Sequence, residues 1–153
     1  MPTSVRELAT IRAVLDTNVV VSALIWGGIP FGLFRAAEEG HLLLFSSTAL
    51  LSELHGVLTR PHLADRLSKQ RVSVADAVGR YATMTTRVRA DVVRRVVRDD
   101  PDDDHVIAAA VAARADIIVT GDRHLLEVES FESVQIIKPM EALALLSRHH
   151  TRR

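Results

Sequence analysis

Short apolar runs alternate with longer stretches of helical periodicity along most of the chain. The apolar runs predict strands at about residues 13–15, 42–45, 116–120 and 134–137. Apolar spacings of three and four residues, with caps and prolines at the ends, predict helices from about residue 18 and over 30–40, 48–60, 73–84, 105–115 and 139–147. Several strands are apolar on both faces and alternate with helices, so we expect an α/β domain with a mainly parallel sheet.

Residues 87–97 fit neither pattern cleanly. They are rich in β-branched side chains, which favours a strand, but they also carry several arginines. Their assignment therefore stays open between helix and strand.

Length and composition indicate one globular domain. The chain has 153 residues, of which 48% are hydrophobic and 25% charged, and no repeat or linker divides it. We expect a single domain over 1–153, with a core at about 12–146 and frayed termini. Lys plus Arg and Asp plus Glu number 19 each, so the net charge neither favours nor excludes a nucleic-acid partner.

The chain contains no cysteine, which excludes disulfides and thiolate metal sites. This composition fits a reducing compartment. The first ten residues have no apolar signal core, and the apolar run 19–29 is too short to span a bilayer. We expect a cytoplasmic protein with no membrane partner.

Two carboxylates follow closely on predicted strands. Asp16 interrupts the apolar stretch RAVLDTNVVVSAL, and Asp122 follows the strand in IIVTGDRHLL. A buried carboxylate is costly unless it is paired or bound to a metal ion. Ligands bind at the carboxyl ends of parallel strands, so both acids are candidates for a site. Taken singly, each also suits the plainer role of capping the next helix.

Glu53 lies within the predicted helix 48–60, beside its apolar stripe. Leu50, Leu54 and Leu58 form that stripe at intervals of four residues. Glu53 therefore flanks the core instead of facing open water. It is either the partner of an arginine or a ligand in a cleft.

An acidic run, DDPDDDHVIAAA, precedes the predicted helix 105–115. A helix N-terminus favours one or two acids, but five repel one another unless they are solvated or bound to cations. Asp104 is followed at three, four and seven residues by Ile107, Ala108 and Val111, so we expect it to start a buried stripe. Of the other acids, Asp99 and Asp100 suit a solvated loop. Whether Asp102 or Asp103 shares the ligand role of Asp104 stays open.

The four candidates Asp16, Glu53, Asp104 and Asp122 fall around one end of the expected sheet. Clustered carboxylates repel one another unless a cation compensates. An all-oxygen donor set selects hard ions, Mg²⁺ or Mn²⁺. Such ions clamp a phosphodiester, prepare a water nucleophile and neutralise the leaving oxygen. The set therefore predicts metal-dependent chemistry on a phosphodiester.

Four motifs in order, VLDTNVVVSAL, SELHGVL, DPDDDHVIAAA and DIIVTGDRHLL, resemble those of PIN-domain proteins, and of their toxin branch in particular. The resemblance covers about residues 12–146. It implies a three-layer α/β/α sandwich around a central parallel sheet. It also implies a Mg²⁺- or Mn²⁺-dependent endoribonuclease that cleaves RNA, often the toxin of a toxin–antitoxin pair.

The same resemblance assigns residues and partners. It implies catalytic, metal-binding roles for Asp16, Glu53, Asp104 and Asp122, and supporting roles for Asn18 and Thr120. It also implies a homodimer and a cognate antitoxin that inserts a segment into the acidic site.

Other functions stay open beside this one. One alternative is a PIN-like protein that binds RNA or a partner without cutting RNA. Loss of one of the four acids would indicate it, and all four are present. A Mg²⁺-dependent phospho-acceptor module needs a lysine after a late strand, where only Lys138 is available, and it has no role for Glu53. A haloacid-dehalogenase-type phosphatase needs Asp-x-Asp where this chain has Asp-Thr-Asn.

Features outside the motifs have plainer interpretations. A basic stretch suits a solvated strand edge or an acid-pairing face better than an RNA contact; it comprises Arg87, Arg89, Arg94, Arg95 and Arg98. His105 and His124 are expected to be surface histidines. Trp26 is expected to pack with Phe31 and Phe34 in a helix pair or a dimer interface.

Overall fold

The computed structural model describes residues 10–90 and 101–152, with side chains at 10–90 and 104–149. Within these ranges the strands are β1 (Ile11–Leu15), β2 (Leu42–Ser46), β3 (Thr85–Arg87), β4 (Ile117–Val119), β5 (Ser130–Phe131) and β6 (Val134–Ile137). They form one sheet in the order β3-β2-β1-β4-β6-β5. The pairs are parallel except for β5 with β6, as the sequence predicts for the main strands.

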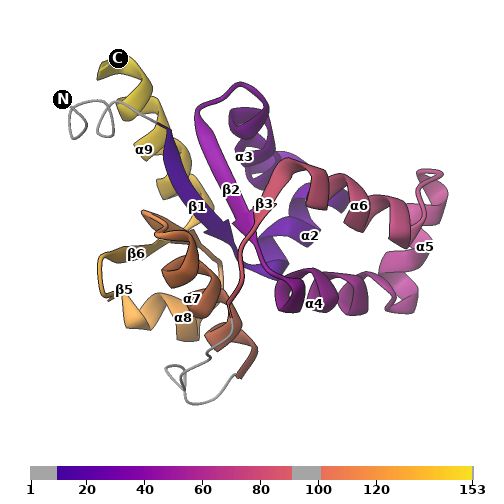
Figure 1. Cartoon of the computed structure of the whole chain (residues 1–153). Helices are drawn as coiled ribbons and strands as arrows, with labels where there is room; N and C mark the ends of the chain where they lie inside the picture. Colours follow the sequence, from indigo (N-terminus) through magenta and orange to yellow (C-terminus); the bar gives the residue numbers. More distant parts are fainter. Residues whose placement is uncertain (1–9, 91–100, 153) are drawn as a thin grey trace.

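Helices cover both faces of this sheet (Figure 1). They are α2 (Thr17–Ile25), α3 (Gly28–Glu38), α4 (Thr48–Leu58), α5 (Pro61–Lys69), α6 (Val74–Met84), α7 (Pro101–Ala113), α8 (Arg123–Val128) and α9 (Pro139–Arg152). The molecule is therefore the expected three-layer α/β/α sandwich.

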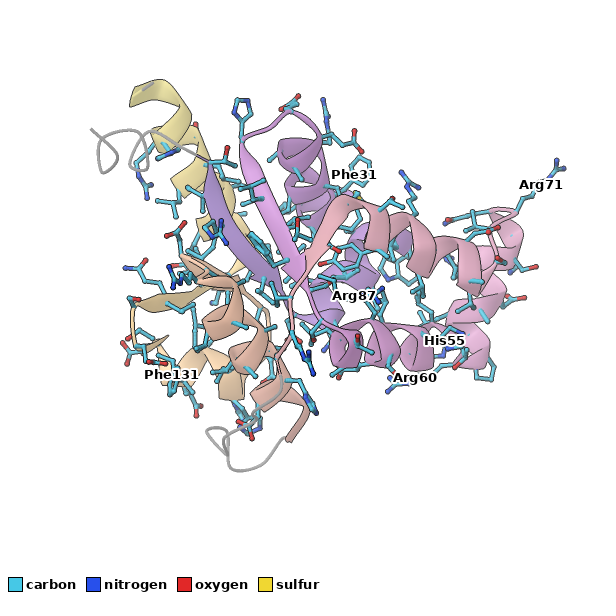
Figure 2. All side chains as sticks on the ribbon, in the orientation of Figure 1. Phe31, His55, Arg60, Arg71, Arg87 and Phe131 are labelled. Carbon is cyan, nitrogen blue, oxygen red and sulfur yellow. The ribbon has the colours of Figure 1, made fainter. Side chains whose placement is uncertain are left out.

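Alternation along the strands divides the core into two layers. Ala13 and Leu15 pack with the apolar residues of α2, α3, α4, α5, α6 and α9. Val14, between them, packs with α7 and α8 on the other face, as does Ile118 of β4. Successive side chains of a strand point to opposite faces, so a strand buried on both sides is apolar throughout. Figure 2 shows side chains filling both layers.

Single residues set several element ends as predicted. Gly40 closes α3 with a φ of 83°, a left-handed conformation that glycine adopts without strain. Ser47 caps α4, because its hydroxyl accepts a hydrogen bond of 3.2 Å from the amide of Leu50. The α4 helix ends at Leu58, before Pro61.

Four elements were not predicted: α5, α8, β5 and the edge strand β3, of which only Arg87 falls within the ambiguous segment 87–97. Pro61 occupies the first turn of α5, and the helix buries only Leu63 and Leu67 among polar neighbours. Its apolar signal is thus two leucines four residues apart. The α8 helix and β5 are short and lie between predicted elements.

Some boundaries also differ from the prediction. The α7 helix begins at Pro101, earlier than the expected residue 105, and α9 continues to Arg152, beyond the expected residue 147. The edge strand β3 ends at Arg87, where the ambiguous segment 87–97 begins, and residues 91–100 of that segment lie outside the described ranges.

No single helix in residues 10–90 and 101–152 is long and apolar enough to cross a membrane. Helices α2 and α3 reach the necessary length and apolar composition only when taken together, and they are bent by 94° relative to each other. Both helices bury residues in the core of the sandwich.

Candidate active site

Asp16 lies immediately after β1, at the carboxyl edge of the sheet, and is 5% exposed. Its amide donates to the carbonyl of Val119 at 2.9 Å, which ties it to the end of β4. Its Oδ1 accepts a hydrogen bond from the amide of Thr17 at 2.8 Å, and its Oδ2 accepts one from the hydroxyl of Thr120 at 2.7 Å. These donors offset the cost of burying the charge.

Thr120 connects the two strand-end acids. It follows β4, is fully buried, and donates its hydroxyl to Asp16. The same oxygen accepts from the amide of Asp122 at 2.9 Å. Asp122 in turn accepts from the amide of His124 at 2.7 Å and so caps α8. The capping roles considered for Asp16 and Asp122 are therefore real, and the Thr120 hydroxyl links the carboxylate of Asp16 to the backbone amide of Asp122.

Glu53 reaches this edge from α4. It is half-buried, as its place beside the Leu50 stripe predicts, while His55 is exposed (Figure 2). One of its carboxylate oxygens accepts from the hydroxyl of Thr17 at 2.6 Å. The bond joins residues 36 apart in sequence and brings Glu53 next to Asp16.

Hydrogen bonds thus join five residues from three segments: Asp16, Thr17, Glu53, Thr120 and Asp122. We call this set the acidic network. Sequence reasoning missed Thr17, although a signal exists. Val20 and Val21 follow it at three and four residues and are buried, so Thr17 lies on the buried face of α2.

Asn18, the other predicted polar residue, has an exposed side chain. The hydrogen bonds that define the acidic network come from Thr17 and Thr120 instead. Of the two predicted supporting residues, only Thr120 belongs to the network.

Asp104 is buried, with 1% of its surface exposed. It lies in the first turns of α7, which packs on β1, β2 and β4. The expected stripe is rotated, because Val111 is 41% exposed while Val106, Ile107 and Ala110 are buried. The prediction of a buried Val111 is wrong, and the prediction of a buried Asp104 is confirmed.

The acids Asp99 and Asp100 lie outside the described residues. The same holds for the side chains of Asp102 and Asp103. Their part in the site therefore stays a prediction.

The donor set suits a hard divalent ion, since it consists of carboxylate and hydroxyl oxygens without sulfur. Among the described side chains, no three of the types His, Cys, Asp and Glu are grouped closely enough to hold an ion. Mg²⁺, however, keeps several waters and is commonly held by one or two carboxylates together with substrate phosphates. Asp16 and Asp104 are buried carboxylates of the type that such an ion takes.

Several basic and aromatic residues outside the acidic network were also considered from the sequence. Arg87 and Arg89 are exposed, whereas Arg94, Arg95 and Arg98 lie outside the described ranges. Phe34 is buried against Tyr81 and Phe31. Trp26, by contrast, is 56% exposed, and the guanidinium of Arg66 lies 4.0 Å from its ring centre. The expected packing of Trp26 with the two phenylalanines is thus not found within the chain, and the dimer interface stays a prediction.

Comparison with known proteins adds two findings. The family described as PIN domain matches residues 12–124, a range that contains every residue of the acidic network and Asp104. The uncharacterized protein MJ1680 of Methanocaldococcus jannaschii is 28% identical over 123 residues, which cover 80% of this chain and 77% of that protein.

Proposed function

The chain belongs to the PIN domain family, whose members are generally nucleases, and we propose that it is a Mg²⁺- or Mn²⁺-dependent endoribonuclease. The observation that carries this proposal is the acidic network, in which hydrogen bonds hold Asp16, Glu53 and Asp122 together at the carboxyl edge of the sheet. A site so rich in carboxylates would repel an RNA phosphate unless a cation neutralised it.

In this proposal the two buried acids, Asp16 and Asp104, are the central metal ligands, and Glu53 and Asp122 complete the site. When bound, a divalent ion polarises the phosphoryl oxygens and lowers the pKa of its water. The protein holds the donors ready: Thr120 fixes one oxygen of Asp16, and Thr17 fixes one oxygen of Glu53. Preset donors avoid reorganisation during the reaction.

Cleavage of a cellular RNA pool by the purified protein tests the proposal, with Mg²⁺, Mn²⁺ or EDTA in parallel. We expect cutting only with metal, and Asp16→Asn should abolish it. The variant should fold, because its amide oxygen can still accept from Thr17 and one acidic charge fewer relieves repulsion.

Asp65→Asn is the matched control, since Asp65 is an exposed acid on α5 that forms an exposed ion pair of little energy with Lys69. It should cut like the wild type. Equal cutting by Asp16→Asn and the wild type would refute the site. A folded wild type that binds but never cuts RNA would favour the non-catalytic alternative.

Three finer proposals rest on the sequence motifs alone. They are that the protein is a toxin, that a cognate antitoxin binds it, and that it forms a homodimer. An upstream reading frame that encodes a small DNA-binding protein would support the toxin role. We infer a cytoplasmic location from the absence of cysteine in the 153 residues.

A further inference from the structure

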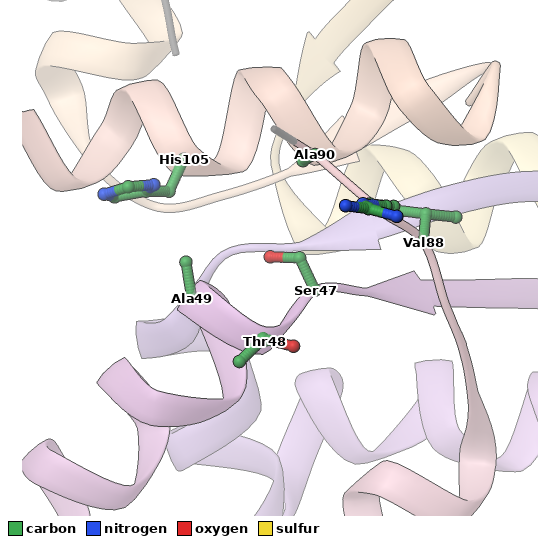
Figure 3. A pocket seen from close by; sticks show the side chains of 7 residues that line it. Ser47, Thr48, Ala49, Val88, Ala90 and His105 are labelled. Atoms are coloured by element: carbon green, nitrogen blue, oxygen red, sulfur yellow. The ribbon is translucent and has the colours of Figure 1, made fainter. Parts of the chain in front are cut away.

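A second feature lies at the same edge of the sheet as the acidic network, at the end of β2. A pocket of about 120 Å³ is lined there by Ser47, Thr48, Ala49, Val88, Arg89, Ala90 and His105. Figure 3 shows His105 of α7 on one side of this space and the start of α4 on the other. Strand β2 is the direct neighbour of β1, the strand that leads into Asp16.

The described lining of the pocket has the chemistry of an anion site. It contains a guanidinium, an imidazole and two hydroxyls, and none of the described lining residues is an acid. Arginine matches the oxygens of a phosphate with two parallel N–H donors. A histidine ring presents at least one N–H donor in either protonation state.

Ser47 adds a buried hydroxyl to this lining. It is 3% exposed, and its oxygen accepts from the amide of Leu50, which leaves its O–H available as a donor. Figure 3 shows this oxygen directed into the space between Ala49 and His105. A buried hydroxyl with its donor toward a pocket suits an anionic acceptor there.

The pocket is also of suitable size. A water molecule takes up about 30 Å³ of liquid volume, so the space exceeds one water and admits a tetrahedral oxyanion. We propose that this pocket, with Ser47, Arg89 and His105 as donors, binds a backbone phosphate of the RNA other than the one that is cut. This inference rests on the proposed function. It adds that a phosphate contact at this pocket positions the RNA relative to the acidic network.

Two binding measurements in EDTA, neither of which reads cleavage, test the inference. In the first, inorganic phosphate is titrated into the protein while backbone amide NMR signals are followed. We expect saturable shifts at Ser47, Thr48 and His105, and about tenfold weaker binding in Arg89→Gln. Arg87→Gln, the same charge change at an exposed residue outside the lining, should bind phosphate like the parent.

In the second measurement, a single-stranded RNA is bound to Asp16→Asn protein with and without Arg89→Gln. Loss of one phosphate contact should reduce the slope of log K against log salt by about 0.7. The assignment of the pocket as a phosphate site would be overturned by phosphate-induced NMR shifts at other residues only. Equal losses of phosphate affinity in Arg87→Gln and Arg89→Gln would also overturn it. Phosphate binding with an unchanged RNA salt slope would overturn its role in RNA binding.

Failure of the proposed nuclease gives a different pattern. In that case the wild type does not cut RNA, while both binding measurements still report on the pocket. Conversely, a wild type that cuts RNA without phosphate binding at this pocket overturns the inference and leaves the nuclease proposal intact.

Discussion

The carboxylate of Asp16 combines a local and a long-range contact. Its Oδ1 caps α2 through the neighbouring amide, while its Oδ2 accepts from a hydroxyl 104 residues away. A carboxylate offers about four lone-pair directions, so capping a helix does not prevent it from binding a cation. The cap and the proposed metal ligand are therefore compatible roles for one side chain.

At the same scale, we predict that Thr17 is a positioning residue. Thr17→Val keeps the shape of the side chain but removes the donor to Glu53. We expect kcat for RNA cleavage to fall about tenfold with little change in KM, because Glu53 is less well placed and the RNA contacts persist. Steady-state kinetics on one RNA substrate measures this.

Thr17→Ser serves as the control, because it restores the hydroxyl. It should recover most of kcat. A parallel loss in both variants would show that the methyl group, and thus packing, matters instead of the hydrogen bond.

At the scale of elements, two helices bring acids to the site from opposite faces of the sheet. Helix α4 packs largely with α2 and α6 and carries Glu53, whereas α7 belongs to the other layer and carries Asp104. Both enter at the carboxyl edge of the sheet. The site thus depends on the docking of both layers.

Helix packing also predicts a response to pH. The chain has one tyrosine, Tyr81 on α6, which is buried and stacked on Phe34 of α3. Burial raises the pKa of its phenol well above 10, because the phenolate would lose its hydration. In the unfolded chain the phenol ionises near pH 10. The unfolded state then binds fewer protons, so stability falls as pH rises above about 10.

Absorbance of the phenolate checks this prediction directly. We expect Tyr81 to ionise together with unfolding, not in a separate step near pH 10. Tyr81→Phe should reduce the alkaline loss of stability. Ionisation near pH 10 in a protein that is still folded by circular dichroism would contradict the assigned burial.

At the scale of the whole molecule, strand order places the site. The chain leaves β1 toward β2 on one side, and β4 lies on the other side of β1. The helix after β1 lies in one layer and the helix after β4 in the other. This is a topological switch point, where open α/β sheets form a crevice at their carboxyl ends.

Metal binding should stabilise the whole fold, because the proposed ligands come from both layers. With free Mn²⁺ at about one hundred times its Kd, the free energy of unfolding should rise by about 2.7 kcal/mol, and EDTA should reverse this. Thermal unfolding measures the shift without RNA. Asp16→Asn should reduce the shift, and Asp65→Asn should keep it; the same shift in all three proteins would argue against Asp16 as a ligand.

The sequence by itself determined the fold class and most of the elements, because periodicity and caps act within a few residues. The apolar run of β1, the glycine after α3 and the proline beyond the end of α4 are signals of this local kind. It also predicted that Asp104 is buried and that Glu53 lies at the edge of the core. The α5 helix was missed because its local apolar signal is two leucines.

Only the tertiary structure decided which polar groups meet. The bonds from Thr17 to Glu53 and from Thr120 to Asp16 span 36 and 104 residues, and both depend on strand order and helix docking. The rotation of α7, which exposes Val111, likewise follows from its packing against the sheet. Hydrogen bonds need atoms within about 3 Å, and only the assembled layers set distances that small between residues so far apart in sequence.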